Sequence, residues 1–185
     1  ASHHQGELEQ TRDLARDLVA QFEGEALDAV LVAASGCGHT LKQYGELLPG
    51  EKGFSAPVLD VHEFLSRLGL SEAFQAQLQP LPKAVAYHDA CHMIHGQGIA
   101  AQPRQLLRAI PELQLREATE AGVCCGSAGI YNLVQPEEAA ALGQLKAADL
   151  SGTGAELIAS ANIGCSLQIR QHLGPDGPPV LHPMQ

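Results

Sequence analysis

Apolar positions along the chain alternate between short continuous runs and helical spacing. Short β-rich runs predict buried strands, whereas apolar residues three or four positions apart predict amphipathic helices. The predicted strands are 28–35, 83–91, 113–118, 155–162 and 180–183. The predicted helices are 8–22, 39–48, 59–70, 103–110, 136–150 and 164–173. Because strands and helices alternate, the pattern favours an α/β fold with mostly parallel sheets.

The sequence also contains an internal repeat with an offset of 128 residues. It aligns GEALDAVLVAASGCGHTLKQ with GTGAELIASANIGCSLQIRQ and so sets Cys37 on Cys165. Each copy reads as a strand, a Gly-Cys pair and a helix, and Pro80 and Pro82 make the clearest break in the chain. We therefore expect two related β-α lobes. Residues 1–80 would be the remnant of a first module, cut near its N-terminus, and residues 81–185 a complete second module.

Composition and charge narrow the classes of function. The 185 residues include 45% hydrophobic ones, enough for a substantial core, and the formal net charge of -10 argues against nucleic acid as a partner. No stretch approaches the roughly 18 unbroken apolar residues of a transmembrane segment, and the start lacks the pattern of a signal peptide. We therefore expect a cytoplasmic protein, with peripheral attachment to the inner face of the cell membrane as an open alternative.

The five cysteines are placed in a way that suits metal binding. Their odd number, without a secretion signal, argues against a disulfide framework. Cys91, the adjacent Cys124 and Cys125, and Cys165 each follow a predicted strand, so a parallel sheet would bring them to one edge. All-thiolate sites belong to zinc or iron–sulfur chemistry, and the chain lacks the paired C-x₂₋₄-C spacing typical of zinc.

The order of these cysteines resembles the cysteine-rich CCG domain of heterodisulfide-reductase-like and glycolate- or lactate-oxidising iron–sulfur subunits. From Cys91, 32 residues lead to Cys124-Cys125-Gly126, and a further 38 lead to Cys165. Three blocks, HDACHMIHGQGIAAQPRQLLRAIPEL, CCGSAGIYNLVQPEEA and NIGCSLQIRQHL, are similar to the C-terminal part of glycolate oxidase iron–sulfur subunits in particular. The similarity covers essentially the whole chain. Such CCG modules occur in tandem, as the internal repeat suggests.

This resemblance implies an electron-transfer function. In the family, a ferredoxin-like N-terminal region precedes two CCG modules, and FAD-binding flavoprotein subunits oxidise glycolate to glyoxylate. The chain carries neither ferredoxin motifs nor a recognisable flavin signature. We therefore expect a component of a glycolate dehydrogenase complex that is not catalytic alone and relays electrons from flavin toward an acceptor such as quinone. A lactate-oxidising counterpart stays open.

The resemblance also implies the ligands of a [4Fe–4S] cluster. The positions that match the motif are Cys91, Cys124, Cys125 and Cys165. The family pattern ends in C-x-x-C, but Gln168 stands in place of its last cysteine. Both a noncubane cluster and a four-thiolate cluster therefore stay open. Cys37 matches the last ligand of the first module and could face the second site instead.

Several neighbours of these cysteines could support a cluster. They are His88, His92, His95, Gly126 and Gln168. The histidines could donate hydrogen bonds to sulfur, take up protons or ligate, or they could simply cap and pack a tight strand-to-helix turn. Asp89, beside them, is expected to be a helix N-cap.

Two other classes of function fit the same residues. One is a cluster-free structural or docking module that contacts flavoprotein subunits, which the replacement at Gln168 favours. The other is a thiol enzyme in which Cys124 or Cys125 is the nucleophile and His92 the base. A brown protein would support the cluster, a colourless and thiol-inert protein the docking module, and alkylation of one cysteine with loss of turnover the enzyme.

Overall fold

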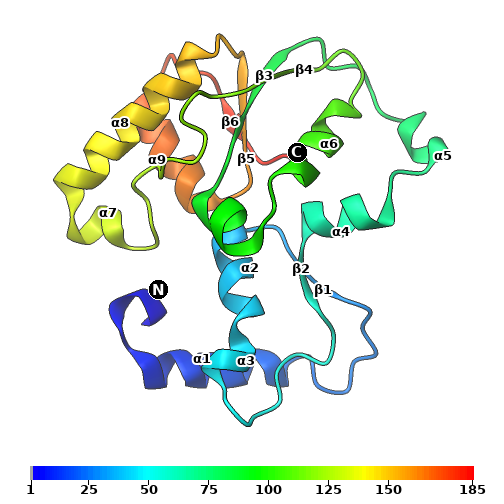
Figure 1. The fold of residues 1–185 in the computed structure, drawn as a ribbon, viewed down its shortest axis with the longest axis vertical. Coiled ribbons are helices and arrows are strands. Elements are labelled where there is room, and N and C mark those ends of the chain that lie inside the picture. Colours follow the sequence, from blue (N-terminus) through cyan, green and yellow to red (C-terminus); the bar gives the residue numbers. More distant parts are fainter. Residues whose placement is uncertain (1) are drawn as a thin grey trace.

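In the computed structural model, which describes residues 2–185, the chain forms an α/β protein with two parallel sheets (Figure 1). The smaller sheet pairs β1 (Val30–Val32) with β2 (Val58–Asp60). The larger sheet has the order β4-β3-β5-β6, made of β4 (Gln114–Arg116), β3 (Ala84–His88), β5 (Leu157–Ser160) and β6 (Val180–Leu181). All four pairings between neighbouring strands are parallel. The predicted α/β class is confirmed.

Helical segments connect these strands. Before β3 they are η1 (Ser2–Gln5), α1 (Leu8–Ala20), α2 (Ser35–Lys42), α3 (Tyr44–Leu47), α4 (Val61–Leu68) and α5 (Glu72–Gln75). After β3 they are the π-helical turn η2 (His92–Gly96), α6 (Ala101–Arg108), α7 (Tyr131–Val134), α8 (Pro136–Gly152) and α9 (Ile163–Leu173). We call the elements from η1 to α5 the first half and those from β3 to β6 the second half. No helix within residues 2–185 is long and apolar enough to cross a membrane.

The larger sheet is buried on both faces, as parallel sheets usually are. On one face Ala86 and Ile158 pack with Leu150 of α8 and Ile169 of α9. On the other face Val85 and Tyr87 of β3 pack with Leu107 of α6. Figure 1 shows α8 and α9 on one side of the sheet and α6 on the other. Each buried leucine or isoleucine contributes roughly 1.5–3 kcal/mol, so these two layers hold the strand ends in place.

The two halves meet where α2 begins. The Ser35 N–H donates to the Ala161 carbonyl oxygen just after β5 (3.2 Å), and the Gly36 N–H donates to Oδ1 of Asn162 (3.3 Å). The Gln97 side chain donates to the Ser35 carbonyl oxygen (2.9 Å). The start of α2 therefore lies at the carboxyl end of the larger sheet.

Two predicted elements differ from the structure. The first residues of the predicted helix 59–70 belong to strand β2, and α4 starts only at Val61. Asp60 is the N-cap of α4, and its side chain accepts a bond from the His62 N–H (2.8 Å). The predicted helix 39–48 is two helices, because α2 begins four residues earlier and ends before Gln43. The SGCG segment after β1 is therefore the first turn of α2.

Candidate metal centre

Four cysteine side chains meet at the carboxyl edge of the larger sheet. They come from three segments: Cys91 after β3, Cys124 and Cys125 between β4 and α7, and Cys165 in the first turn of α9. Thiol contacts link Cys91 to Cys124, Cys124 to Cys125, and Cys125 to Cys165. The chain leaves β3 for β4 on one side and later returns to β5 on the other. The thiols thus lie at the point where the strand order reverses, which is where open α/β sheets bind ligands.

The site has a buried end and a more accessible end. Cys125 is 1% exposed and Cys165 is 4% exposed, and both belong to the hydrophobic core beneath the sheet edge. Cys91 and Cys124 are half-buried. A group held by all four thiols would therefore be shielded from water on one side and accessible on the other.

The backbone conformation at position 126 explains why a glycine follows the two cysteines. Its φ angle is +87°, and a methyl group at this position would overlap the carbonyl oxygen of Ala139 in α8. Only glycine adopts this backbone conformation without strain and leaves room for α8. Its N–H donates to Cys124 Sγ at 3.3 Å.

Backbone and side-chain N–H groups surround the sulfur atoms. Besides Gly126, the N–H groups of His92 and Ser127 bond to Cys91 and Cys125 respectively. The Asn162 side chain donates to Cys165 Sγ at 3.2 Å. Because such bonds stabilise negative charge on sulfur, the four thiols and their donors fit a metal group that is bound by thiolates.

The thiols hold their protons unevenly. Contacts with the thiols of Cys125 and Cys91 lower the pKa of Cys124 to about 2, and the contact with Cys125 also lowers the pKa of Cys165. The same contacts, together with burial, raise the pKa of Cys91 and Cys125. Since the four side chains interact, they titrate as one unit and offer thiolates, the form that binds metals, next to protonated partners.

His88 lies against the buried end of the site. It is the last residue of β3 and pairs in register with Ser160 of β5, and its Nδ1 lies 3.1 Å from Ser160 Oγ. One of its ring nitrogens, Cys125 Sγ and Cys165 Sγ all lie within 4.8 Å of one another. Burial, aided by the nearby Lys146, lowers the pKa of His88 to about 3, so the ring is neutral.

Gln168 stands at the position of the last family cysteine, but its side chain is hydrogen-bonded to residues outside the group of thiols. Its side chain is buried, its Nε2 donates to the Ala139 carbonyl oxygen (3.0 Å), and its Oε1 accepts from Asn132 Nδ2 (3.2 Å). The amide therefore ties α9 to α7 and α8.

Other predicted residues lie outside the group of thiols. Cys37 is exposed on α2 and takes part in none of the thiol contacts among the described residues. His95 is exposed and bonds to the Gly122 carbonyl oxygen (3.2 Å), while the ring of His92 stacks on His39 with centroids 5.5 Å apart. The histidine stack gives no support to His92 as a base for Cys124 or Cys125.

The expectation for Asp89 is wrong. Its two carboxylate oxygens accept from the Arg104 guanidinium at 2.8 and 2.6 Å, and Cys91 holds the N-cap position of η2 without a side-chain bond. A buried carboxylate is satisfied better by a two-bond ion pair with arginine than by a single backbone N–H, which explains the difference. This pair anchors the segment that carries Cys91 to α6.

Two residues of the site were missed by the sequence analysis. Asn162 could have been found, because it stands between a predicted strand and a Gly-Cys pair, where side chains often cap the helix that follows. Lys146 gave no signal, since lysine in an alanine-rich helix is usually exposed. In the structure its side chain is 1% exposed, and its amine donates to the Glu120 carbonyl oxygen and lies 3.7 Å from Asp149.

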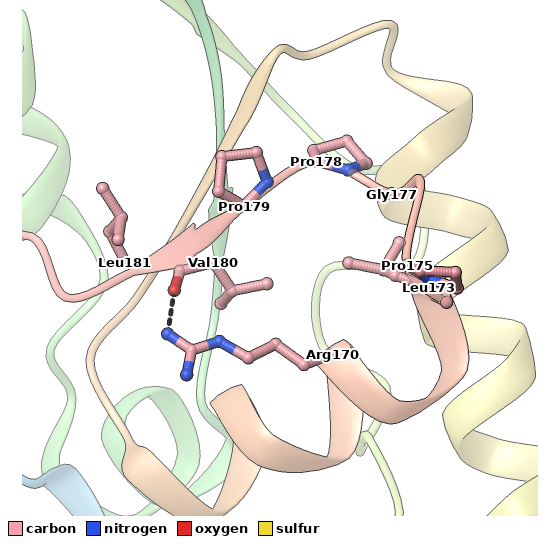
Figure 2. Close-up of a pocket in the computed structure, with 9 residues that line it drawn as sticks. Arg170, Leu173, Pro175, Gly177, Pro178, Pro179, Val180 and Leu181 are labelled. Atoms are coloured by element: carbon pink, nitrogen blue, oxygen red, sulfur yellow. Dashed lines mark hydrogen bonds between the residues drawn. The ribbon is translucent and has the colours of Figure 1, made fainter.

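A separate pocket of about 330 Å³ lies at the other end of α9 (Figure 2). It is lined by Leu173 and by residues 177–181, and the Arg170 guanidinium spans it to reach the Val180 carbonyl oxygen. Cys165 is in the first turn of α9 and Leu173 in the last, so the pocket is not part of the thiol site.

Comparison with known sequences defines the class of protein. The cysteine-rich CCG domain matches residues 1–42 and 85–170, which together make up more than half of the chain. The chain therefore belongs to the cysteine-rich CCG domain family. The second matched range contains Cys91, Cys124, Cys125 and Cys165.

Individual relatives are iron–sulfur and redox subunits. The chain is 36% identical over 179 residues to the "Probable glycolate oxidase iron-sulfur subunit" of Bacillus subtilis, covering 94% of this chain and 40% of that protein. Over 168 residues it is 33% identical to one of the subunits of the fumarate reductase (CoM/CoB) of Methanothermobacter marburgensis, covering 89% and 32%. It is also 30% identical over 145 residues to the "Glycolate oxidase iron-sulfur subunit" of Escherichia coli, covering 77% and 35%. The chain thus spans two fifths or less of these relatives.

Proposed function

We propose that this chain binds an iron–sulfur cluster through Cys91, Cys124, Cys125 and Cys165 and transfers electrons within a glycolate-oxidising complex. The observation that carries the proposal is the meeting of four thiols from three separate segments at one sheet edge. The names of the relatives, among them two glycolate oxidase iron–sulfur subunits, support the same assignment. When bound, such a cluster accepts and releases single electrons.

The residues of the site would then have different roles. The four thiolates hold the cluster, which would be of the [4Fe–4S] type, either cubane or noncubane. The Gly126 N–H and the Asn162 amide donate to sulfur, and such bonds stabilise the reduced state. Cys125 and Cys165 close the site from the core, whereas the half-buried side at Cys91 and Cys124 is where electrons would enter or leave.

We further propose that the chain consists of two tandem CCG modules, residues 1–80 and 81–185. The division between two sheets supports this boundary, and so does the match of the domain to two separate ranges. Only the second module brings four thiols together among the described residues. FAD-binding subunits of the same complex would supply electrons in the cytoplasm or at the inner face of the cell membrane, with quinone as the acceptor.

The test is the content of iron and acid-labile sulfide after anaerobic purification and reconstitution. We expect about four irons and four sulfides per chain with broad visible absorption, both lost in Cys124→Ser and in Cys125→Ser. Circular dichroism should show that each variant is folded. A folded wild-type chain without iron, or with zinc and no sulfide, would overturn the proposal and favour the docking module.

A second experiment tests whether glycolate or lactate is the electron donor of the proposed complex. The reconstituted chain is mixed anaerobically with FAD-binding flavoprotein subunits of the proposed complex, and glycolate or lactate is added. We expect glycolate to bleach the cluster absorption at least about tenfold faster than lactate, a discrimination of about 1.4 kcal/mol. Faster bleaching with lactate would reassign the complex to lactate oxidation.

A further inference from the structure

We propose that His88 is a direct metal ligand at this centre and supplies the donor that Gln168 does not. The inference rests on the proposed function, because it requires that the four thiols bind metal. It assigns a fifth ligand to a strand residue, 80 positions before the place where the family motif has its last cysteine.

The geometry around His88 is that of a ligand group. A ring nitrogen of His88, Cys125 Sγ and Cys165 Sγ lie within 4.8 Å of one another, and all three side chains are buried. Within residues 2–185, no other three His, Cys, Asp or Glu residues bring their ligand atoms so close together. The two sulfurs belong to the chain of thiol contacts, so His88 joins an existing donor set.

The alternative fifth donor, Gln168, is excluded by its own hydrogen bonds. Both ends of its amide are used, one by the Ala139 carbonyl oxygen and the other by Asn132. Turning the side chain toward the thiols would break both hydrogen bonds, which costs roughly 0.5–1.5 kcal/mol for each bond. Position 168 therefore packs α9 against its neighbours.

The contact with Ser160 is compatible with an imidazole that binds metal through its other nitrogen. His88 and Ser160 end neighbouring strands in register, and Nδ1 lies 3.1 Å from Ser160 Oγ. When Nδ1 carries the hydrogen and donates it to this oxygen, Nε2 keeps a free lone pair. Histidine ligands of metals almost always donate their other ring N–H in this way.

Nitrogen in place of a thiolate changes the charge of the ligand set. A neutral imidazole contributes one negative charge fewer than cysteine, and replacing cysteine by histidine raises the reduction potential of iron–sulfur centres. His88→Cys should therefore keep the iron and lower the midpoint potential. His88→Asn should retain the fold but bind iron about 10–100-fold more weakly.

The decisive experiment is pulsed electron paramagnetic resonance of the reconstituted, reduced chain containing ¹⁵N-labelled histidine. We expect the strong hyperfine coupling of a directly bound nitrogen, absent in His88→Asn and His88→Cys. It should be unchanged in the matched controls His92→Asn and His95→Asn, whose rings lie near Cys91 in sequence but outside the donor group. If a substitution at position 88 prevents folding, the labelled wild-type chain with the two controls still decides.

The outcomes separate the two proposals. A wild-type centre that holds iron and sulfide but shows no directly bound nitrogen would overturn the role of His88 and leave the proposed function standing. A coupling that persists in His88→Asn would do the same. Failure of the wild-type chain to bind iron at all would overturn both.

Discussion

Cys37 and Cys165 occupy the same place in two similar strand-to-helix units, yet only Cys165 lies in the group of four thiols. The units correspond closely: the Val30 N–H bonds to the Pro57 carbonyl oxygen and the Ile158 N–H to the Pro179 carbonyl oxygen, each at 2.9 Å. Cys37 is exposed, whereas Cys165 is buried and in contact with Cys125. The pattern of strand, Gly-Cys pair and helix therefore places a thiol at a sheet edge, but it does not by itself bring further thiols to it.

The difference comes from what packs on the glycine beside each cysteine. A Cβ atom on Gly164 would lie 2.8 Å from Ser127 Oγ, so the CCG segment rests directly on the first turn of α9. A Cβ atom on Gly36 would instead lie 3.4 Å from Oδ1 of Asn162, a residue of the other half. The second half thus surrounds its cysteine with further thiols, while the first half uses the same surface to contact its neighbour.

The largest expected difference between the two units is in metal binding. Cys165→Ser should reduce iron retained after desalting by more than about tenfold, because it removes one of the four proposed ligands. Cys37→Ser should leave the iron content unchanged. Both are measured by iron analysis of the reconstituted chain, and equal losses in the two variants would contradict the distinction drawn between them.

The next effect concerns glycines with left-handed backbone in the two halves. Gly126→Ala combines positive φ with overlap against α8, so the free energy of unfolding of the metal-free chain should fall by about 3 kcal/mol. Gly24→Ala has a similar φ of +83° but nothing within 4 Å, and should cost about 1 kcal/mol. Urea unfolding measures both values. Similar losses would show that α8 moves to accept the methyl group.

Two lysines provide a smaller contrast. Lys146→Met removes a buried charged donor to the Glu120 carbonyl oxygen and should lower the free energy of unfolding by about 2 kcal/mol. Lys42→Met removes a partly exposed partner of Glu63 (2.7 Å) and should cost under about 1 kcal/mol. Thermal unfolding of the two variants tests the difference. A Lys146→Met chain as stable as wild type would mean that the methionine packs well enough to offset the lost bond.

The smallest expected effect depends on pH. Hydrogen bonds from Arg104 lower the pKa of Glu117, and those from Arg16 lower the pKa of Glu51. A lowered pKa stabilises the fold above the ordinary glutamate pKa of about 4.3, and this contribution is lost as the pH falls through the folded value. At pH 7 Glu117→Gln should cost under about 1 kcal/mol, and the cost should shrink as the pH falls through the folded-state pKa. Glu51→Gln, which removes an exposed ion pair with Arg16, should change stability less. The reverse order in urea unfolding would count against this account.

Much of the architecture was predictable because burial leaves a strong pattern. β3 is buried at every residue, and all of its residues except the last, His88, form an apolar run in the sequence. The strand ends after it and after β5 then determine where Cys91 and Cys165 lie. β2 was not predictable, since its three residues run directly into the apolar spacing of α4 and a strand this short has no period of its own.

The details of the site were less predictable because they depend on long-range contacts. The sequence identifies the four cysteines, but it does not show that His88 and Ser160, 72 residues apart, face each other across two strands. It also does not show that Asp89 forms an ion pair with Arg104 and does not cap a helix. Lys146 and Gln168 are polar residues of helices whose burial becomes visible only once the helices are packed.

Asn162 links the contact between the two halves to the group of thiols. One side of its amide accepts from Gly36 at the start of α2, and the other donates to the sulfur of Cys165. A single side-chain amide therefore connects the two halves and also donates a hydrogen bond to one of the four cysteine sulfurs. Any partner that displaces α2 would remove the Gly36 bond that orients this amide, and would so loosen a hydrogen bond to a sulfur atom that it never touches.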